Sequence, residues 1–289
     1  MMLENTQFLP RATTSPSILG PSIDFQMTPM KKTITGSSAT TRSFLTTRAV
    51  FASSLLLLLC APMALAQCLF QPGERILFQG DSITDMGRGR TEDPNHILGH
   101  GYAFIIAARE GADYPDHHLT FINRGVSGNE TGDLLKRWQT DTLDLKPDVL
   151  SILIGVNDFG HAAKAETPFS VADYEQRYDQ LLSETVAALP KVKLVLCEPF
   201  FGLGKGTVAH IDRWKATMPQ MDAVVEKLAN KYHAPVVHFQ KVFDDALKRA
   251  PIDYWIWDGV HPTYSGHQLM ADEWKRVYKS FYDSENSGG

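Results

Sequence analysis

The stretch RILFQGDSIT, residues 75–84, decides the fold, because a short apolar run ends directly in a glycine and small polar residues. Such a continuously apolar run is typical of a strand that is buried on both faces of a parallel sheet. Further runs of strand length follow at 119–122, 149–154, 192–196 and 235–239. The sequence therefore predicts five buried strands.

Segments of helical period separate these runs. The clearest is 171–189, which Ser170 can cap at its N-terminus and which Pro190 ends. Further helices are predicted at 103–109, 132–140, 221–232, 242–250 and 267–282. Strands that alternate with helices form a parallel sheet covered on both faces. The predicted fold class is therefore α/β, a three-layer α/β/α sandwich with a five-stranded parallel sheet.

The first 66 residues have the pattern of a targeting segment. Basic residues precede an apolar run at 49–65, and the small-residue motif Ala64-Leu65-Ala66 ends it. We predict an N-terminal extension with a signal peptide that is cleaved after this motif, export to the periplasm or out of the cell, and one domain over residues 67–289. An uncleaved membrane anchor is the alternative, which Pro62 disfavours because it interrupts the run.

The net charge of the chain indicates which classes of binding partner to expect. Residues 1–66 hold five basic and two acidic residues, so the remaining residues, 67–289, carry a net charge of about −8. Such a surface disfavours nucleic acid and anionic membranes as partners, and a neutral small substrate fits better. The sequence does not specify an oligomeric state.

The histidines and cysteines show no metal-binding spacing such as His-Glu-x-x-His or Cys-x-x-Cys. We therefore predict that the protein needs neither a metal nor another cofactor. Gly202–Gly206 lacks the full phosphate-loop pattern and is interpreted as an ordinary loop. Cys68 and Cys197 could pair in an oxidising compartment, but Cys197 lies in an apolar run and a plain buried thiol is favoured.

Three predicted strands deliver polar, glycine-bearing loops to one edge of the sheet. Ser82 follows the first strand, residues 123–129 follow the second, and residues 155–158 end the third. The N–H groups of Ser82 and Gly128 and the amide of Asn157 can converge there on one oxygen, as an oxyanion hole for acyl transfer requires. Each loop alone is more simply explained as a turn, but together they favour an acyl-transfer site.

Asp258 and His261 lie three residues apart, just before the last predicted helix. One tight turn can hold both near Ser82, where imidazole is the natural base for a hydroxyl and a carboxylate fixes its tautomer. A surface turn with a capping aspartate is the alternative. Ser127 is a rival nucleophile, but Asn129 replaces the last glycine of the Gly-x-Ser-x-Gly nucleophile elbow.

These motifs resemble, in order and spacing, the four sequence blocks of the SGNH (GDSL-like) hydrolases. The blocks are Gly80-Asp81-Ser82, Gly128, Gly155-Val156-Asn157-Asp158 and Asp258-Gly259-Val260-His261. The resemblance implies the flavodoxin-like fold of that family and a serine esterase. It assigns the nucleophile to Ser82, the general base and acid to His261, and the orienting carboxylate to Asp258. It likewise implies an oxyanion hole made by Ser82, Gly128 and Asn157.

Within that family, residues 74–282 resemble the acetylxylan esterases and related carbohydrate deacetylases of GDSL type. This resemblance implies hydrolysis of O-acetyl esters, on acetylated xylan or another carbohydrate, through an acyl-enzyme. One alternative is a lysophospholipase or thioesterase that acts on longer acyl chains. A more remote alternative is an inactive carbohydrate-binding surface protein.

Substrate contacts are expected from Asp81, His100, Trp255 and Trp257. The two tryptophans could stack on a sugar ring, and core packing is the competing interpretation. Residues 202–217 do not resemble the corresponding family segment. This departure leaves the acceptor or leaving-group pocket, and with it the sugar, unassigned.

Overall fold

The structure is a computed structural model, which describes residues 68–287 of the chain. The predicted signal peptide and its cleavage site in residues 1–66 lie outside this range. Within the described range, no helix is long and apolar enough to cross a membrane.

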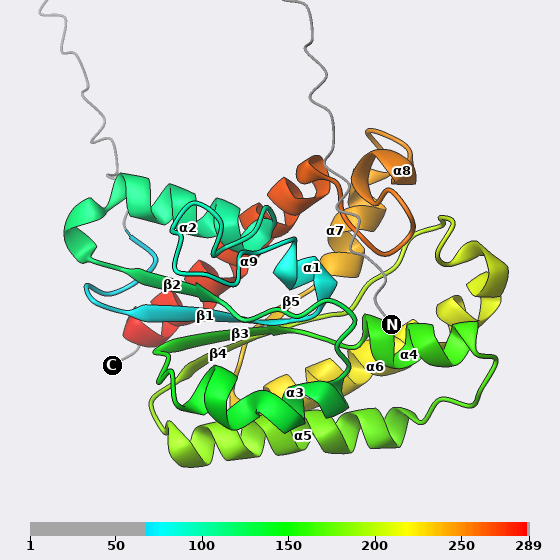
Figure 1. Cartoon of the computed structure of the whole chain (residues 1–289), viewed down its shortest axis with the longest axis horizontal. Helices are drawn as coiled ribbons and strands as arrows, with labels where there is room; N and C mark the ends of the chain where they lie inside the picture. The colour runs from blue at the N-terminus through cyan, green and yellow to red at the C-terminus, as the bar shows by residue number, and fades with distance from the viewer. Residues whose placement is uncertain (1–67, 288–289) are drawn as a thin grey trace, which may run out of the picture. The chain divides into compact units, whose positions relative to one another are not determined.

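A parallel sheet forms the centre of the fold (Figure 1), as the apolar runs predict. Its strands are β1 (Arg75–Gly80), β2 (Thr120–Asn123), β3 (Val149–Leu153), β4 (Lys193–Cys197) and β5 (Val236–Val237). They lie in the order β2-β1-β3-β4-β5 and all pair in parallel. The chain moves outward in opposite directions on the two sides of β1. That switch point is where open parallel sheets bind ligands.

Helices cover both faces of the sheet. They are α1 (Ser82–Asp85), α2 (Tyr102–Asp113), α3 (Thr131–Trp138), α4 (Val156–Lys164), α5 (Val171–Ala188), α6 (Ile211–Tyr232), α7 (Phe239–Ala246), α8 (Ile252–Trp255) and α9 (Tyr264–Ser287). On one face α2 and α7 pack against α9, and on the other α5 packs between α3 and α6 (Figure 1). The predicted three-layer α/β/α sandwich is confirmed.

The layers are joined by side chains that are apolar over most of their surface and polar at one end. Trp274 on α9 is fully buried, and its ring N–H donates to the Ser151 hydroxyl on β3 at 2.9 Å. On the opposite face, the hydroxyl of Tyr174 on α5 donates to the Ile154 carbonyl at 3.1 Å. These bonds satisfy polar groups that would otherwise be costly to bury.

Helices α1, α4 and α8 are not among the predicted elements, and several predicted elements have other bounds. β5 is only two residues long, because the chain turns into α7 at the buried Phe239. The helix predicted from residue 221 begins at Ile211 and contains Pro219, since the buried Trp214 and Met218 bring its first turns into the core.

The thiol of Cys197 is free and fully buried on β4, in agreement with the prediction. Cys68 is also unpaired.

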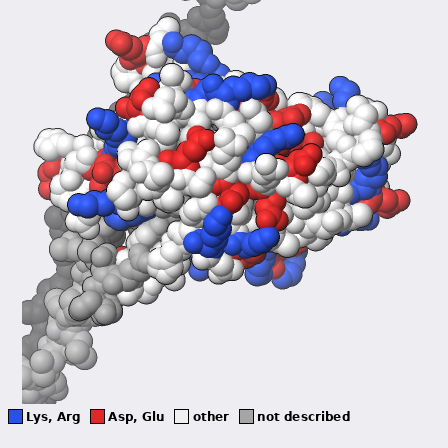
Figure 2. Space-filling view, turned by 90° about the horizontal axis from the view of Figure 1, so that it is seen from below, with Lys and Arg blue, Asp and Glu red and all other residues white. Residues whose placement is uncertain are grey.

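Figure 2 shows the face of the molecule opposite α2, with acidic and basic side chains interspersed. Ion pairs connect α5 and α6: Lys227 with Glu175, and Lys231 with Asp179.

Candidate active site

The first strand delivers Ser82 to the switch point of the sheet. β1 ends at Gly80, whose φ is +157°, and a Cβ there would lie 2.3 Å from the Leu153 carbonyl oxygen. Glycine therefore permits a close approach of β1 to β3 just before the turn. Ser82 is the first residue of α1, so its backbone N–H has no acceptor within that helix.

The structure brings Ser82, His261 and Asp258 together in one line. Ser82 Oγ lies 2.9 Å from His261 Nε2, and His261 Nδ1 lies 2.8 Å from Asp258 Oδ2. Since the carboxylate can only accept, Nδ1 carries the proton and Nε2 is left to accept from the serine hydroxyl. This arrangement can deprotonate the hydroxyl and stabilise the imidazolium that results.

The carboxylate of Asp258 is held ionised by its surroundings. Burial opposes ionisation, but hydrogen bonds from the backbone N–H and the ring of His261, together with the N–H of Val260, outweigh it and hold the pKa of Asp258 below its usual value. Asp258 Oδ1 accepts the two backbone N–H groups at 3.0 Å from Val260 and 2.8 Å from His261. The aspartate thus fixes both the turn and the ring.

The other two predicted loops end beside β1. Gly128 is exposed and has a φ of +83°, and a Cβ on it would meet no atom within 4 Å. Asn157 stands in the first turn of α4, after Gly155 with a φ of +131°. One hydrogen of its side-chain amide is donated to the Asn129 carbonyl at 3.1 Å. The amide has two N–H hydrogens, so its second N–H is left for another acceptor.

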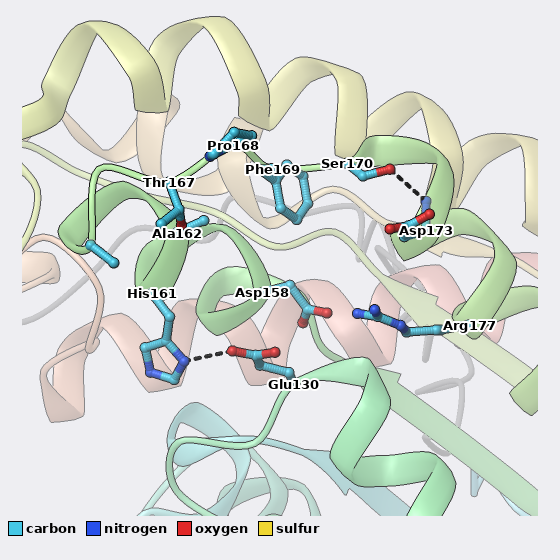
Figure 3. A pocket seen from close by; sticks show the side chains of 11 residues that line it. Glu130, Asp158, His161, Ala162, Thr167, Pro168, Phe169, Ser170, Asp173 and Arg177 are labelled. Atoms are coloured by element: carbon cyan, nitrogen blue, oxygen red, sulfur yellow. Dashed lines mark hydrogen bonds and ion pairs between the residues drawn. The ribbon is translucent and has the colours of Figure 1, made fainter.

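A buried carboxylate ties these two loops together. Asp158 accepts the backbone N–H of Thr131 at 3.1 Å and its hydroxyl at 2.5 Å, which joins the first turns of α3 and α4. Its side chain lines a cavity of about 380 Å³, and Figure 3 shows it facing Arg177 there. In the same view, Glu130 pairs with His161 at 2.6 Å. Burial raises the pKa of Asp158 to about 6.

This contact is not among the features predicted from the sequence. The apolar residues of α4 that face the core, Val156, Phe159 and Ala163, follow a helical period and could have revealed the helix. Glycine and polar residues between them obscure that period. The pairing of Asp158 with Thr131 spans 27 residues and leaves no local signature.

Two predicted substrate contacts are buried. Asp81 is only 1% exposed and accepts the Ile83 N–H at 2.9 Å as the cap of α1, and burial raises its pKa to about 7. Trp255 is 7% exposed, and its ring N–H donates to the carbonyls of Ala246 and Ala250. Both expectations are corrected, because these side chains are occupied within the fold.

The other two predicted contacts are accessible. Trp257 is 53% exposed, with the ammonium group of Lys205 placed 3.8 Å from the centre of its ring. His100 is exposed, and its Nδ1 donates to the Met86 carbonyl at 2.9 Å.

The rival nucleophile, Ser127, has a different environment. Its hydroxyl donates to Asp85 Oδ2 at 3.0 Å, and the same carboxylate pairs with Arg90. A carboxylate held by an arginine is a poor base, so Ser127 lacks the activation that Ser82 receives.

One group of side chains in the described range has the composition of a metal site. Atoms of Glu198, Glu226 and His238 lie within 4.8 Å of one another. The two ring nitrogens of His238 point to different carboxylates, Nδ1 to Glu198 at 2.6 Å and Nε2 to Glu226 at 3.4 Å. This geometry is that of an imidazole bridging two carboxylates, and it lies outside the wall of the Ser82 site.

A pocket of about 400 Å³ opens beside His261. Asn157 and Asp258 belong to its wall. The segment that departs from the family pattern, residues 202–217, supplies much of the rest, including Lys205, His210 and Trp214.

The chain resembles characterised esterases over most of the described range. Residues 78–269 match the GDSL-like Lipase/Acylhydrolase family. An acetylxylan esterase from Geobacillus stearothermophilus is 36% identical over 208 residues, which are 69% of this chain and 91% of that protein. A lipoprotein from Bacillus subtilis is 27% identical over 139 residues, 48% of this chain and 56% of the relative.

Solved structures agree with these similarities. A GDSL-like lipase from Parabacteroides merdae has a TM-score of 0.69 with 38% identity, over 73% of this chain and 98% of the other. A variant of the Geobacillus acetylxylan esterase has a TM-score of 0.65 with 33% identity, over 73% and 96%. In two further structures of that enzyme, described as catalytic mutants, a serine and an aspartate are each replaced by alanine.

The family match spans well over half of the chain, and the acetylxylan esterase is covered over nine-tenths of its length. The order of the four sequence blocks, the parallel sheet and the arrangement around Ser82 agree with this match. The chain therefore belongs to the GDSL-like lipase/acylhydrolase family, and it is a carboxylic ester hydrolase.

Proposed function

We propose that this protein is a serine esterase that removes O-acetyl groups from a carbohydrate, such as acetylated xylan, through an acyl-enzyme. The observation that carries the proposal is the line of hydrogen bonds from Ser82 Oγ through His261 to Asp258, at 2.9 and 2.8 Å. Such a line activates a hydroxyl that is otherwise a weak nucleophile.

In the first half of the reaction, Ser82 Oγ attacks the ester carbonyl carbon and His261 Nε2 takes the hydroxyl proton. The carbonyl oxygen becomes an anion. Donors for this anion are the N–H groups of Ser82 and Gly128 and the second amide hydrogen of Asn157. His261 then gives its proton to the departing alcohol oxygen as the ester C–O bond breaks.

In the second half, water enters and His261 removes one of its protons. The hydroxide attacks the acyl carbon of the acyl-enzyme, and the same donors stabilise the second oxyanion. When the intermediate collapses, Ser82 regains its proton from His261 and acetate leaves. Asp258 keeps its negative charge throughout and fixes the ring.

The acetyl-carbohydrate assignment is supported by the similarity to an acetylxylan esterase over nine-tenths of that enzyme. The exposed ring of Trp257, directly before Asp258, supports it further, since an aromatic face next to the reacting groups suits a sugar ring. The serine and aspartate replacements described as catalytic in the Geobacillus enzyme match Ser82 and Asp258 in residue type.

Export is part of the proposal. It rests on the basic and apolar pattern of residues 1–66 and on the similarity to a lipoprotein. Expression of the full chain in a Gram-negative host, followed by mass analysis of the mature N-terminus, tests it. A product that begins at Gln67 supports cleavage, and an intact N-terminus in the membrane fraction supports the anchor.

The substrate is tested with a series of p-nitrophenyl esters and with acetate release from acetylated xylans, pectins and simple sugars. A preference for acetate over octanoate supports the deacetylase, and the reverse indicates a lysophospholipase or thioesterase. Treatment with an organophosphate, followed by peptide mass analysis, should label Ser82 and leave Ser127 unmodified. Binding of acetylated xylan without acetate release and without labelling would identify an inactive binding protein.

A further inference from the structure

We infer that the pocket beside His261 receives the departing alcohol. His261 must give its proton to the alcohol oxygen, and its ring is part of the pocket wall together with Asn157. A group attached to that alcohol therefore extends into this space, which has a volume of about 400 Å³. This assignment rests on the function proposed above.

Two lysines belong to the pocket wall. Lys164 is the last residue of α4, and Lys205 belongs to the loop after β4. Neither forms an ion pair with a carboxylate in the part of the chain that the structure describes. The one acidic residue in the wall is Asp258, whose carboxylate is taken up by the ring and backbone of His261. The pocket is therefore locally cationic.

The N-terminal end of α6 adds to the positive charge of the pocket. His210 precedes the 22 residues of this helix and belongs to the pocket wall, and its side chain makes no capping hydrogen bond. The N-terminal end of a helix carries a partial positive charge. Asp212 lies in the first turn but is exposed and is not part of the wall. The cationic wall contrasts with the net negative charge of the domain.

The loop that carries Lys205 is anchored to the turn of the catalytic aspartate. The N–H of Gly206 donates to the Asp258 carbonyl at 2.7 Å, and the N–H of Gly202 donates to the Gly259 carbonyl at 2.8 Å. The ammonium group itself lies 3.8 Å from the centre of the Trp257 ring. The charge therefore has a defined position next to the proposed sugar platform.

We propose that this pocket binds a carboxylate on the alcohol portion of the ester, so that the enzyme prefers acetylated acidic sugars, such as uronic acids, over neutral ones. Two cations next to the reacting groups attract an anionic substrate and hold it through charge-assisted hydrogen bonds. The net charge of residues 67–289, from which a neutral substrate is predicted, does not determine the charge of this one pocket.

Two acetylated methyl glycosides of glucuronic acid test the proposal, one with the free carboxylate and one with its methyl ester. The methyl ester removes the charge and adds a methyl group, and because it is itself a carboxylic ester, acetate release is the quantity measured. We expect the wild type to hydrolyse the carboxylate with a kcat/KM about tenfold higher, and the preference to shrink as NaCl rises from about 0.05 to about 0.5 M. Lys164→Gln and Lys205→Gln should each lower the preference about threefold. Lys215→Gln, an exposed lysine outside the pocket, is the matched control.

Equal rates for the two glycosides in the wild type overturn the proposal, and so does a preference that survives both substitutions and high salt. The salt dependence of the wild-type preference tests the proposal even if a variant does not fold. A hemisuccinate ester of neutral methyl glucoside that reacts faster than its acetate would place the anion on the acyl side, against the proposal. If the wild type does not hydrolyse p-nitrophenyl acetate either, the proposed function fails together with this inference.

Discussion

Asp258 binds His261 twice: Oδ2 lies 2.8 Å from the ring Nδ1, and Oδ1 accepts the backbone N–H at 2.8 Å. Asp258→Asn keeps the size of the side chain but replaces the acceptor that fixes the ring tautomer. We expect kcat on p-nitrophenyl acetate to fall roughly 10²- to 10⁴-fold with an unchanged circular dichroism spectrum. Asp253→Asn, on the exposed side of α8, is the control and should retain full activity.

Asn157 is expected to act on the transition state. Asn157→Ala removes one donor for the oxyanion, so kcat should fall roughly 10²- to 10³-fold while KM changes little. Steady-state kinetics with p-nitrophenyl acetate measure both values. Asn230→Ala, an exposed substitution on α6, provides the comparison. A normal kcat in Asn157→Ala would remove this residue from the oxyanion hole.

The burial of Asp81 makes stability depend on pH. Its pKa is raised from 3.8 to about 7 in the folded protein, so the folded state holds the proton more tightly than the unfolded state does. The resulting contribution to the free energy of unfolding is complete below about pH 4 and is lost as the pH rises through about 7. Between these limits it falls by about 1.4 kcal/mol for each pH unit.

Asp81→Asn keeps an oxygen for the Ile83 N–H but cannot ionise, so its stability relative to the wild type should rise between pH 4 and pH 7. Urea unfolding across this range measures the difference. Asp245→Asn is the control, because the pKa of this exposed carboxyl is lowered to about 2 by Lys241 and Lys248. Its substitution should alter the pH profile only below about pH 4. Parallel pH profiles for Asp81→Asn and the wild type would contradict the prediction.

Gly204 leaves no room for a side chain. A Cβ there would lie 2.2 Å from the Asp258 carbonyl carbon, within the backbone of the aspartate turn. Gly204→Ala should therefore lower the melting temperature and reduce activity together, because the turn must move. Gly111→Ala, on α2 with no atom within 4 Å of its added Cβ, should retain activity and raise stability by up to about 1 kcal/mol. Unchanged activity and melting temperature in Gly204→Ala would show that the loop can shift at no cost.

The sequence predicted the sheet well, because each of its first four strands is a continuous apolar run that ends in glycine or polar residues. The predicted fifth strand is longer than β5, since the apolar Phe239 continues the run beyond His238 although the chain already enters α7 there. Helix α4 was missed because its core residues are few and are separated by polar ones.

Asp258 and His261 could be predicted as neighbours because one turn holds both. Ser82 was placed beside them by the end of its strand and by the family resemblance. The burial of Asp81 and Trp255 could not be predicted from such motifs. Asp81 and Trp255 are of types that often contact sugars, and only the packing of α1 and α8 turns them inward. The place of Lys205 in the pocket depends on contacts between the loop and the Asp258 turn, over 50 residues apart in the chain.

In the glycine-rich loop after β4, residues 202–208, some positions contact the turn of Asp258 and others point away from it. Gly202, Gly204 and Thr207 face the aspartate turn and are constrained by backbone contacts, whereas Leu203, Lys205 and Val208 project outward. Directed evolution confined to the outward positions can therefore retune which esters are accepted while the inward positions preserve the proton relay. The outward positions of this loop can vary in sequence while its anchored positions keep the backbone in place.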